Sequence, residues 1–140
     1  MPKPSGIMVG SLLLFSAVPA FADDLTGVDS MICAANSVVE CQDDGDCSTG
    51  SPSEMNVPQF IEVDLRGKRL STTRTSGLNR ATAILYLQRQ GEQIVLQGYE
   101  NGRAFSFVIG EKTGLLSAAI AAQGLTVGVF GACTPVAASR

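Results

Sequence analysis

Apolar and polar residues alternate along most of the chain that follows residue 60. Ile61, Val63 and Leu65 are separated by acidic residues, and this period of two residues predicts a strand with one face towards a core and the other towards water. Similar short runs follow, with turn signals about every ten residues. The rhythm predicts an all-β protein in which an antiparallel meander forms a small barrel or a sandwich.

The predicted strands cover residues 61–65, 69–73, 80–88, 93–99, 103–109 and 125–133. Asn101-Gly102 is the strongest hairpin signal, because both residues tolerate the positive φ angles that a type I′ turn requires. Residues 115–123 are rich in helix formers, and Gly124 would suit the end of a helix. Their position between two strand signals nevertheless favours a strand, with a helix as the alternative.

The segment before residue 60 is less regular. Val28, Met31 and Ile32 have the spacing of a short helical turn, and residues 38–41 have the pattern of a strand. Residues 43–45 and 50–58 contain the glycines and prolines that are typical of turns and loops. Three glycines lie inside strand patterns, at Gly98, Gly128 and Gly131, which predicts bulges, bends or close packing of backbones there.

Residues 1–22 have the features of a cleaved export signal. Lys3 precedes a short apolar stretch, and Ala20-Phe21-Ala22 provides the small-x-small pattern before a cleavage point between Ala22 and Asp23. The apolar stretch is too short to span a bilayer. We therefore expect a periplasmic or secreted protein in which residues 23–140 form one domain with no membrane span.

The four cysteines, Cys33, Cys41, Cys47 and Cys133, all follow this signal, so an oxidising compartment favours two disulfides. Cys41 and Cys47 flank a turn and could face each other across a hairpin. Cys133 shares a strand face with Leu125, Val127 and Val129, and pairing it with Cys33 would join the start of the fold to its last strand. Other pairings are possible from the sequence alone.

The composition excludes several chemistries. Histidine and tryptophan are both absent, so Ser-His-Asp and Cys-His nucleophilic mechanisms are impossible within this chain. No cofactor is expected. No metal site is expected either, because the acidic segment around Asp44 lacks the glycine and the final glutamate of a calcium-binding loop. We expect a protein that is not an enzyme, with a carboxylate-based hydrolase as the least favoured alternative.

Charge is divided unevenly along the chain. Residues 23–65 carry acidic residues and no lysine or arginine, whereas most later charges are basic. The two halves could dock within one fold, or one could attract a charged partner. The overall net charge of −3 argues against nucleic-acid binding. A basic run is the candidate partner-binding region for an anionic protein or ligand: Arg66, Lys68, Arg69, Arg74 and Arg80.

Aromatic residues provide a second candidate site. They could line a ligand cavity in a barrel interior, although aromatic residues also fill ordinary barrel cores. The candidate ligand-lining residues are Tyr86, Tyr99, Phe105, Phe107 and Phe130.

Several short strings resemble those of small exported proteobacterial proteins of unassigned function: Asn56-x-Pro58-x-Phe60, Leu96-Gln97-Gly98, Gly102-Arg103-Ala104-Phe105-Ser106 and Phe130-Gly131-Ala132-Cys133. A more distant architectural resemblance is to periplasmic lysozyme inhibitors, small β-barrels in which a disulfide joins early and late strands. Ser76-Gly77 matches part of their inhibitory loop, but no tryptophan follows it. The resemblance implies a binding function without catalytic residues.

Together these features predict a non-enzymatic periplasmic or secreted binding module. One form of this prediction is an inhibitor or protein-binding protein that acts through residues 66–80. The alternative is a carrier of a small apolar ligand in a β-barrel interior.

Overall fold

The computed structural model describes residue 2 and residues 23–137 of the chain. Ten strands and one short 3-10 helix occur in this part. The strands are β1 (Ser30–Gln42), β2 (Cys47–Gly50), β3 (Phe60–Asp64), β4 (Arg69–Thr72), β5 (Ala81–Ala83), β6 (Tyr86–Gln90), β7 (Gln93–Glu100), β8 (Arg103–Gly110), β9 (Leu115–Ala122) and β10 (Leu125–Pro135). The 3-10 helix η1 (Arg74–Ser76) follows β4. The prediction of an all-β antiparallel fold is therefore confirmed.

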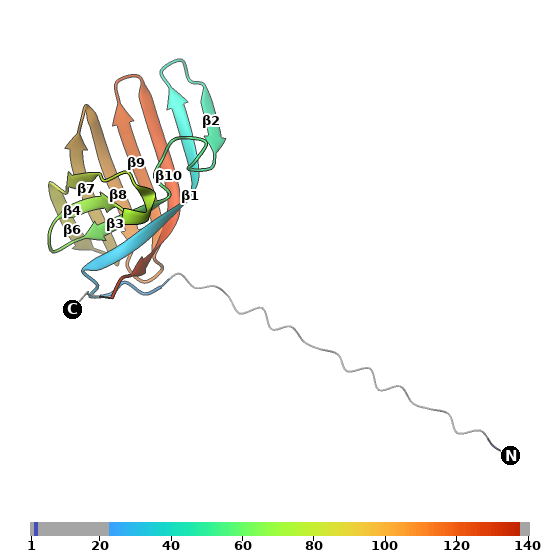
Figure 1. The fold of residues 1–140 in the computed structure, drawn as a ribbon, viewed down its shortest axis with the longest axis vertical. Coiled ribbons are helices and arrows are strands. Elements are labelled where there is room, and N and C mark those ends of the chain that lie inside the picture. The colour runs from blue at the N-terminus through green and yellow to red at the C-terminus, as the bar shows by residue number, and fades with distance from the viewer. Residues whose placement is uncertain (1, 3–22, 138–140) are drawn as a thin grey trace.

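All ten strands belong to one antiparallel sheet that curls into a half-barrel (Figure 1). The strand order is β5-β4-β3-β1-β10-β9-β8-β7-β6, and β2 pairs with β1 beside this path. The curl brings β3 and β4 in front of β7 and β8 (Figure 1), and a hydrogen bond from Thr82 on β5 to Glu100 on β7 joins the two sides. The concave face therefore lies between two walls of the same sheet.

The two edge strands of the sheet, β5 and β6, are separated in sequence by only Ile84 and Leu85. The amide of Ile84 donates to the carbonyl of Lys68, directly before β4, whereas the amide of Leu85 donates to the carbonyl of Gln97 on β7. The segment 80–88, predicted as one strand, is thus divided at a corner where the chain changes its pairing partner. This corner joins the two edges of the half-barrel.

Apolar side chains fill the concave face at one end of the half-barrel. The most deeply buried include Leu25, Met31, Ile94, Leu96 and Ile109. Leu25 precedes β1, and its amide donates to the carbonyl of Glu111 after β8, so the N-terminal segment closes this end of the core. The opposite end is left open.

Two segments whose sequences have helical features form strands. Residues 115–123 form a strand, β9, in agreement with the context of that segment and against its helix propensity. The prediction of a helical turn around Val28, Met31 and Ile32 was wrong, because Met31 and Ile32 belong to the long strand β1. A bulge between Ala35 and Ser37 interrupts the alternation of β1, so its period of two is hard to recognise.

Both disulfides join residues that are direct cross-strand partners. Cys33 on β1 is bonded to Cys133 on β10, and Cys41 on β1 is bonded to Cys47 on β2. The pairing expected from the sequence is confirmed, and no cysteine is free. Two disulfides indicate an oxidising compartment outside the cytoplasm.

The expected export signal lies outside the described residues, except for Pro2. Among residue 2 and residues 23–137, we find no helix with the length and apolar character needed to cross a membrane.

Candidate ligand-binding cavity

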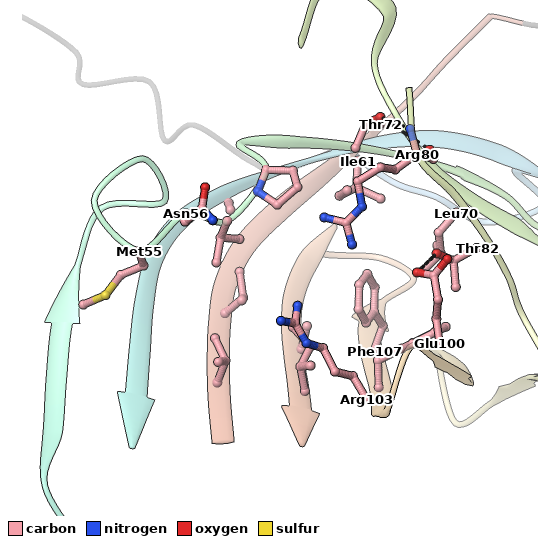
Figure 2. Close-up of a pocket in the computed structure, with 18 of the residues that line it drawn as sticks. Met55, Asn56, Ile61, Leu70, Thr72, Arg80, Thr82, Glu100, Arg103 and Phe107 are labelled. Carbon is pink, nitrogen blue, oxygen red and sulfur yellow. Dashed lines mark hydrogen bonds between the residues drawn. The ribbon is translucent and has the colours of Figure 1, made fainter. Parts of the chain in front are cut away.

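The open end of the half-barrel contains a cavity of about 740 Å³ (Figure 2). Its floor is built from cross-strand rows, because the strand register places inward-facing residues of β8, β9 and β10 directly opposite one another. The deeper row contains Phe107, Ala118 and Val129, and the next row towards the mouth contains Phe105, Ile120 and Val127. The deeper row is buried and the outer row is half-buried. The floor is therefore apolar and leads from the core towards solvent.

Phe105 owes its place on this floor to a glycine. Its cross-strand partner is Gly98 on β7, and a Cβ at position 98 would overlap the Phe105 ring. The ring also meets Phe107 edge to face, with centroids 5.7 Å apart. The same Cβ would lie 2.8 Å from the backbone carbonyl oxygen of Ala83, so of the bulge, bend or close backbone packing predicted at Gly98, the close packing is confirmed.

The facing wall comes from β3, β4, β5 and the loop before β3. Ile61 and Leu70 contribute apolar surface, and Thr72 and Thr82 contribute hydroxyl groups. The loop contributes residues 55–58, of which Met55 and Val57 pack against the core. The cavity is thus bounded by segments that are far apart in the sequence.

A carboxylate organises this loop. Glu54 accepts hydrogen bonds from the amide and the hydroxyl of Ser51, both at 2.7 Å. These two bonds, the backbone amide first, hold the pKa of Glu54 below its ordinary value, because they favour the charged form. The backbone turn is completed by a bond from the amide of Val57 to the carbonyl of Pro52, which fixes the residues that face the cavity.

Four charged residues line the mouth: Arg80, Arg103, Glu40 and Glu100. Figure 2 shows the guanidinium groups of Arg80 and Arg103 pointing into the cavity. Glu100 accepts a hydrogen bond of 2.5 Å from the hydroxyl of Thr82. The cavity therefore combines an apolar floor with a charged and hydrogen-bonding rim.

The structure separates the five residues of the basic run. Arg66 and Lys68 lie in the turn before β4, and Arg69 is the first residue of that strand. Arg74 belongs to η1, beyond the other end of β4, and Arg80 lies in the cavity mouth. Arg66 forms a salt bridge of 2.8 Å with Asp29. The run is therefore distributed over both ends of β4 and does not form a single patch.

The aromatic candidates lie on both faces of the sheet. Phe105 and Phe107 line the cavity. Tyr86, Tyr99 and Phe130 are exposed by 46%, 62% and 51%, respectively, and they are absent from the lining. Their assignment as lining residues was wrong, because the strand register turns them to the convex face. Phe130, for example, lies between Val129 and Gly131 on β10, which are both buried on the opposite face of the strand.

Sequence reasoning did not identify Arg103, Glu100 or Glu40 as residues of the site. Arg103 and Glu100 flank the Asn101-Gly102 turn that the sequence did identify, and they are cross-strand partners. The position of that hairpin at a mouth depends on the curl of the whole sheet, so local patterns carried no signal for it.

The acidic segment after β1 is a turn. Asp44 accepts a hydrogen bond of 2.9 Å from the amide of Asp46. Among residue 2 and residues 23–137, no three Cys, Asp or Glu residues are grouped so that they could hold a metal ion.

Comparison with known proteins gives no family to which the chain can be assigned. No protein-family model matches the chain, and no curated protein matches it either.

Proposed function

We propose that the protein is a non-enzymatic binding protein whose half-barrel cavity takes up a small, largely apolar molecule. The observation that carries this proposal is the open cavity of about 740 Å³ with an apolar floor. Its volume falls within the range of about 300–1,000 Å³ that is common for small-molecule sites. A molecule on the rows of Phe105 and Phe107 would remove apolar surface from water without any rearrangement of the sheet.

The strength of such binding follows from the hydrophobic effect. Each buried methylene group contributes about 0.8 kcal/mol, which is roughly a fourfold gain in affinity. Affinity should therefore rise with the length of an unbranched apolar chain until the floor is covered.

A charge placed on the floor provides the test. The variant Ile120→Lys puts an ammonium group between Phe105 and Val127, and we expect it to weaken binding of the uncharged fluorescent probe N-phenylnaphthylamine at least about tenfold. Ala121→Lys is the matched control, because Ala121 is the next residue of β9 and is exposed on the other face. A folded wild-type protein that does not bind the probe, or equal binding by both variants, would refute the proposal.

We also propose that the protein is exported to the periplasm or secreted, with cleavage between Ala22 and Asp23. The two disulfides support this location, because they persist in oxidising compartments. The intact mass of the protein purified from the exported fraction tests it: a chain beginning at Asp23 is expected, and a full-length chain would contradict it.

A second candidate function is protein binding or inhibition through the basic run. Lys68, Arg69 and Arg74 are exposed, and within the described residues none of them forms a salt bridge. Native mass spectrometry of the protein from its source compartment separates the two functions, because a small added mass favours the cavity and a protein complex favours the run. In the second case, reversing Arg69 and Arg74 to glutamate should weaken the complex.

Turnover of the bound molecule would favour the third possibility, a carboxylate-based hydrolase. Glu40 and Glu100 are the carboxylates in the cavity lining. The same mass spectra answer this question, since an unchanged ligand supports binding and a cleaved ligand supports hydrolysis.

A further inference from the structure

Arg80 and Arg103 enter the cavity mouth from different parts of the sheet. Arg80 directly precedes β5, and Arg103 is the first residue of β8. Both side chains are exposed, and within residue 2 and residues 23–137 neither forms a salt bridge. Each guanidinium therefore keeps its planar set of N–H donors available to a ligand.

Backbone hydrogen bonds hold Arg80 in place, and a side-chain hydrogen bond engages the carboxylate of Glu100. The amide of Arg80 donates to the hydroxyl of Thr72 at 3.0 Å, and its carbonyl accepts from the amide of Thr72 at 3.0 Å. The backbone of Arg80 is thus fixed to β4, with its side chain directed into the cavity (Figure 2). Glu100 is the cross-strand partner of Arg103, yet its carboxylate bonds to Thr82.

We infer that the ligand is an amphipathic monoanion, an unbranched apolar chain with a carboxylate head group held by Arg80 and Arg103. This inference rests on the proposed function, because the chain would lie on the apolar rows. Guanidinium groups bind carboxylates through short, charge-assisted hydrogen bonds, and two of them stand where the floor meets solvent. A cationic head group would meet two like charges at these arginines, and of the two carboxylates in the lining, Glu100 is already hydrogen-bonded to Thr82.

The charges at the mouth favour one negative charge on the ligand over two. Glu40 and Glu100 balance the two arginines, so the lining is formally neutral. A monoanion leaves one excess negative charge, whereas a dianion such as an alkyl phosphate leaves two in a region of reduced dielectric constant. A carboxylate therefore fits this lining better than a phosphate.

The test compares ligands that share one apolar chain and differ in the head group. Decanoate, decanol, decylamine and decyl phosphate are titrated into the wild-type protein as competitors of N-phenylnaphthylamine. An added probe is needed because the chain has no tryptophan. We expect decanoate to bind about tenfold more tightly than decanol at low salt, and the difference to shrink as salt rises. Decylamine and decyl phosphate should bind more weakly than decanoate.

Substitutions then assign the preference to the two arginines. Arg80→Gln and Arg103→Gln should each weaken decanoate binding about three- to tenfold and leave decanol within about twofold. Glu100→Gln should strengthen decanoate binding, because it removes a like charge. Lys112→Gln is the matched control, since it makes the same change of charge in the exposed turn between β8 and β9, outside the cavity, and should leave both affinities unchanged.

The failure of this inference differs from the failure of the proposed function. Equal affinities for decanoate and decanol, or tighter binding of decylamine or decyl phosphate, would overturn the monoanion inference and leave the apolar cavity as a binding site. No binding of any of the four molecules or of the probe by folded protein would overturn both. An effect of Lys112→Gln equal to that of the cavity variants would show a general charge effect and overturn the assignment to Arg80 and Arg103.

Discussion

The absence of a side chain at Gly131 allows β1 and β10 to approach each other. A Cβ at this position would overlap the carbonyl oxygen of Ala34 on β1. The neighbouring atoms are backbone, so a methyl group could be accommodated only by moving one of the two strands. We expect Gly131→Ala to lower the free energy of unfolding by about 2–3 kcal/mol, as overpacked sites do, measured by urea unfolding.

Gly128 provides the control on the same strand. A Cβ there would have only the carbonyl oxygen of Val39 nearby, at 3.9 Å, which is an ordinary contact. Gly128→Ala should therefore change the free energy of unfolding by less than about 0.5 kcal/mol, or raise it slightly, because alanine restricts the unfolded chain. Equal losses from both substitutions would contradict the role given to Gly131.

Glu54 is expected to make the order of the loop before β3 depend on pH. Its pKa is lowered by hydrogen bonds from Ser51, so the charged carboxylate stabilises the loop at every pH above the ordinary value. This contribution is lost as the pH falls through the lowered pKa of the folded state. The protection factor of the Ser51 amide against hydrogen exchange, measured by NMR, should fall in that acidic range in the wild type. In Glu54→Gln this protection should already be lower at neutral pH, and a wild-type profile of protection against pH in that variant would contradict this prediction.

At the scale of elements, the corner between β5 and β6 is the feature that joins the edges of the half-barrel. Ile84 is only 3% exposed, whereas Leu85 beside it is 71% exposed. We expect Ile84→Ala to cost about 2–4 kcal/mol through the lost burial and the cavity left behind. Leu85→Ala should cost less than about 0.5 kcal/mol. Urea unfolding of both variants tests the corner, and similar losses would show that Ile84 does not anchor it.

The sequence predicted most strands but not this corner. The β-branched and aromatic residues of segment 80–88 continue through Ile84 and Leu85 without a glycine, a proline or a turn signal. The break arises because the two halves pair with different strands, β4 and β7. This is a tertiary effect, and a local pattern contains no information about it.

In β1, an irregularity within the strand itself hides the strand pattern. Ala35 and Val38 are both buried although three positions separate them, because the bulge between Ala35 and Ser37 shifts the register. The helical turn near Met31 was predicted from a similar spacing of three residues, between Val28 and Met31, but Val28 lies before β1 and Met31 within it. β9 was recognised because its neighbours on both sides had clear strand patterns, although its own composition favours a helix.

At the scale of the molecule, the sequence could predict which residues face inwards on one strand but not which strands face each other. Phe105, Phe107 and Arg80 were among the candidates and line the cavity. Tyr86 and Tyr99 were chosen by residue type, and the register places them on the other face. Arg103 could be recognised only once the curl of the sheet brought the β7–β8 hairpin opposite β5.

The two disulfides should contribute unequally to the stability of the whole molecule. Cys33–Cys133 closes a sequence separation of 100 residues, whereas Cys41–Cys47 closes one of 6. The loop-entropy model assigns about 4–5 kcal/mol to the first and about 2 kcal/mol to the second.

The first disulfide is also buried in the core, since both of its cysteines are 2% exposed. Replacing Cys33 and Cys133 together with alanine should therefore lower the midpoint of urea unfolding much more than replacing Cys41 and Cys47. Because Cys33 also lines the cavity, the first double variant should lose probe affinity as well, whereas the second, at the β1–β2 hairpin, should keep it. A larger loss of stability on replacing Cys41 and Cys47 would contradict the loop-entropy model, in which the disulfides act by restricting the unfolded chain.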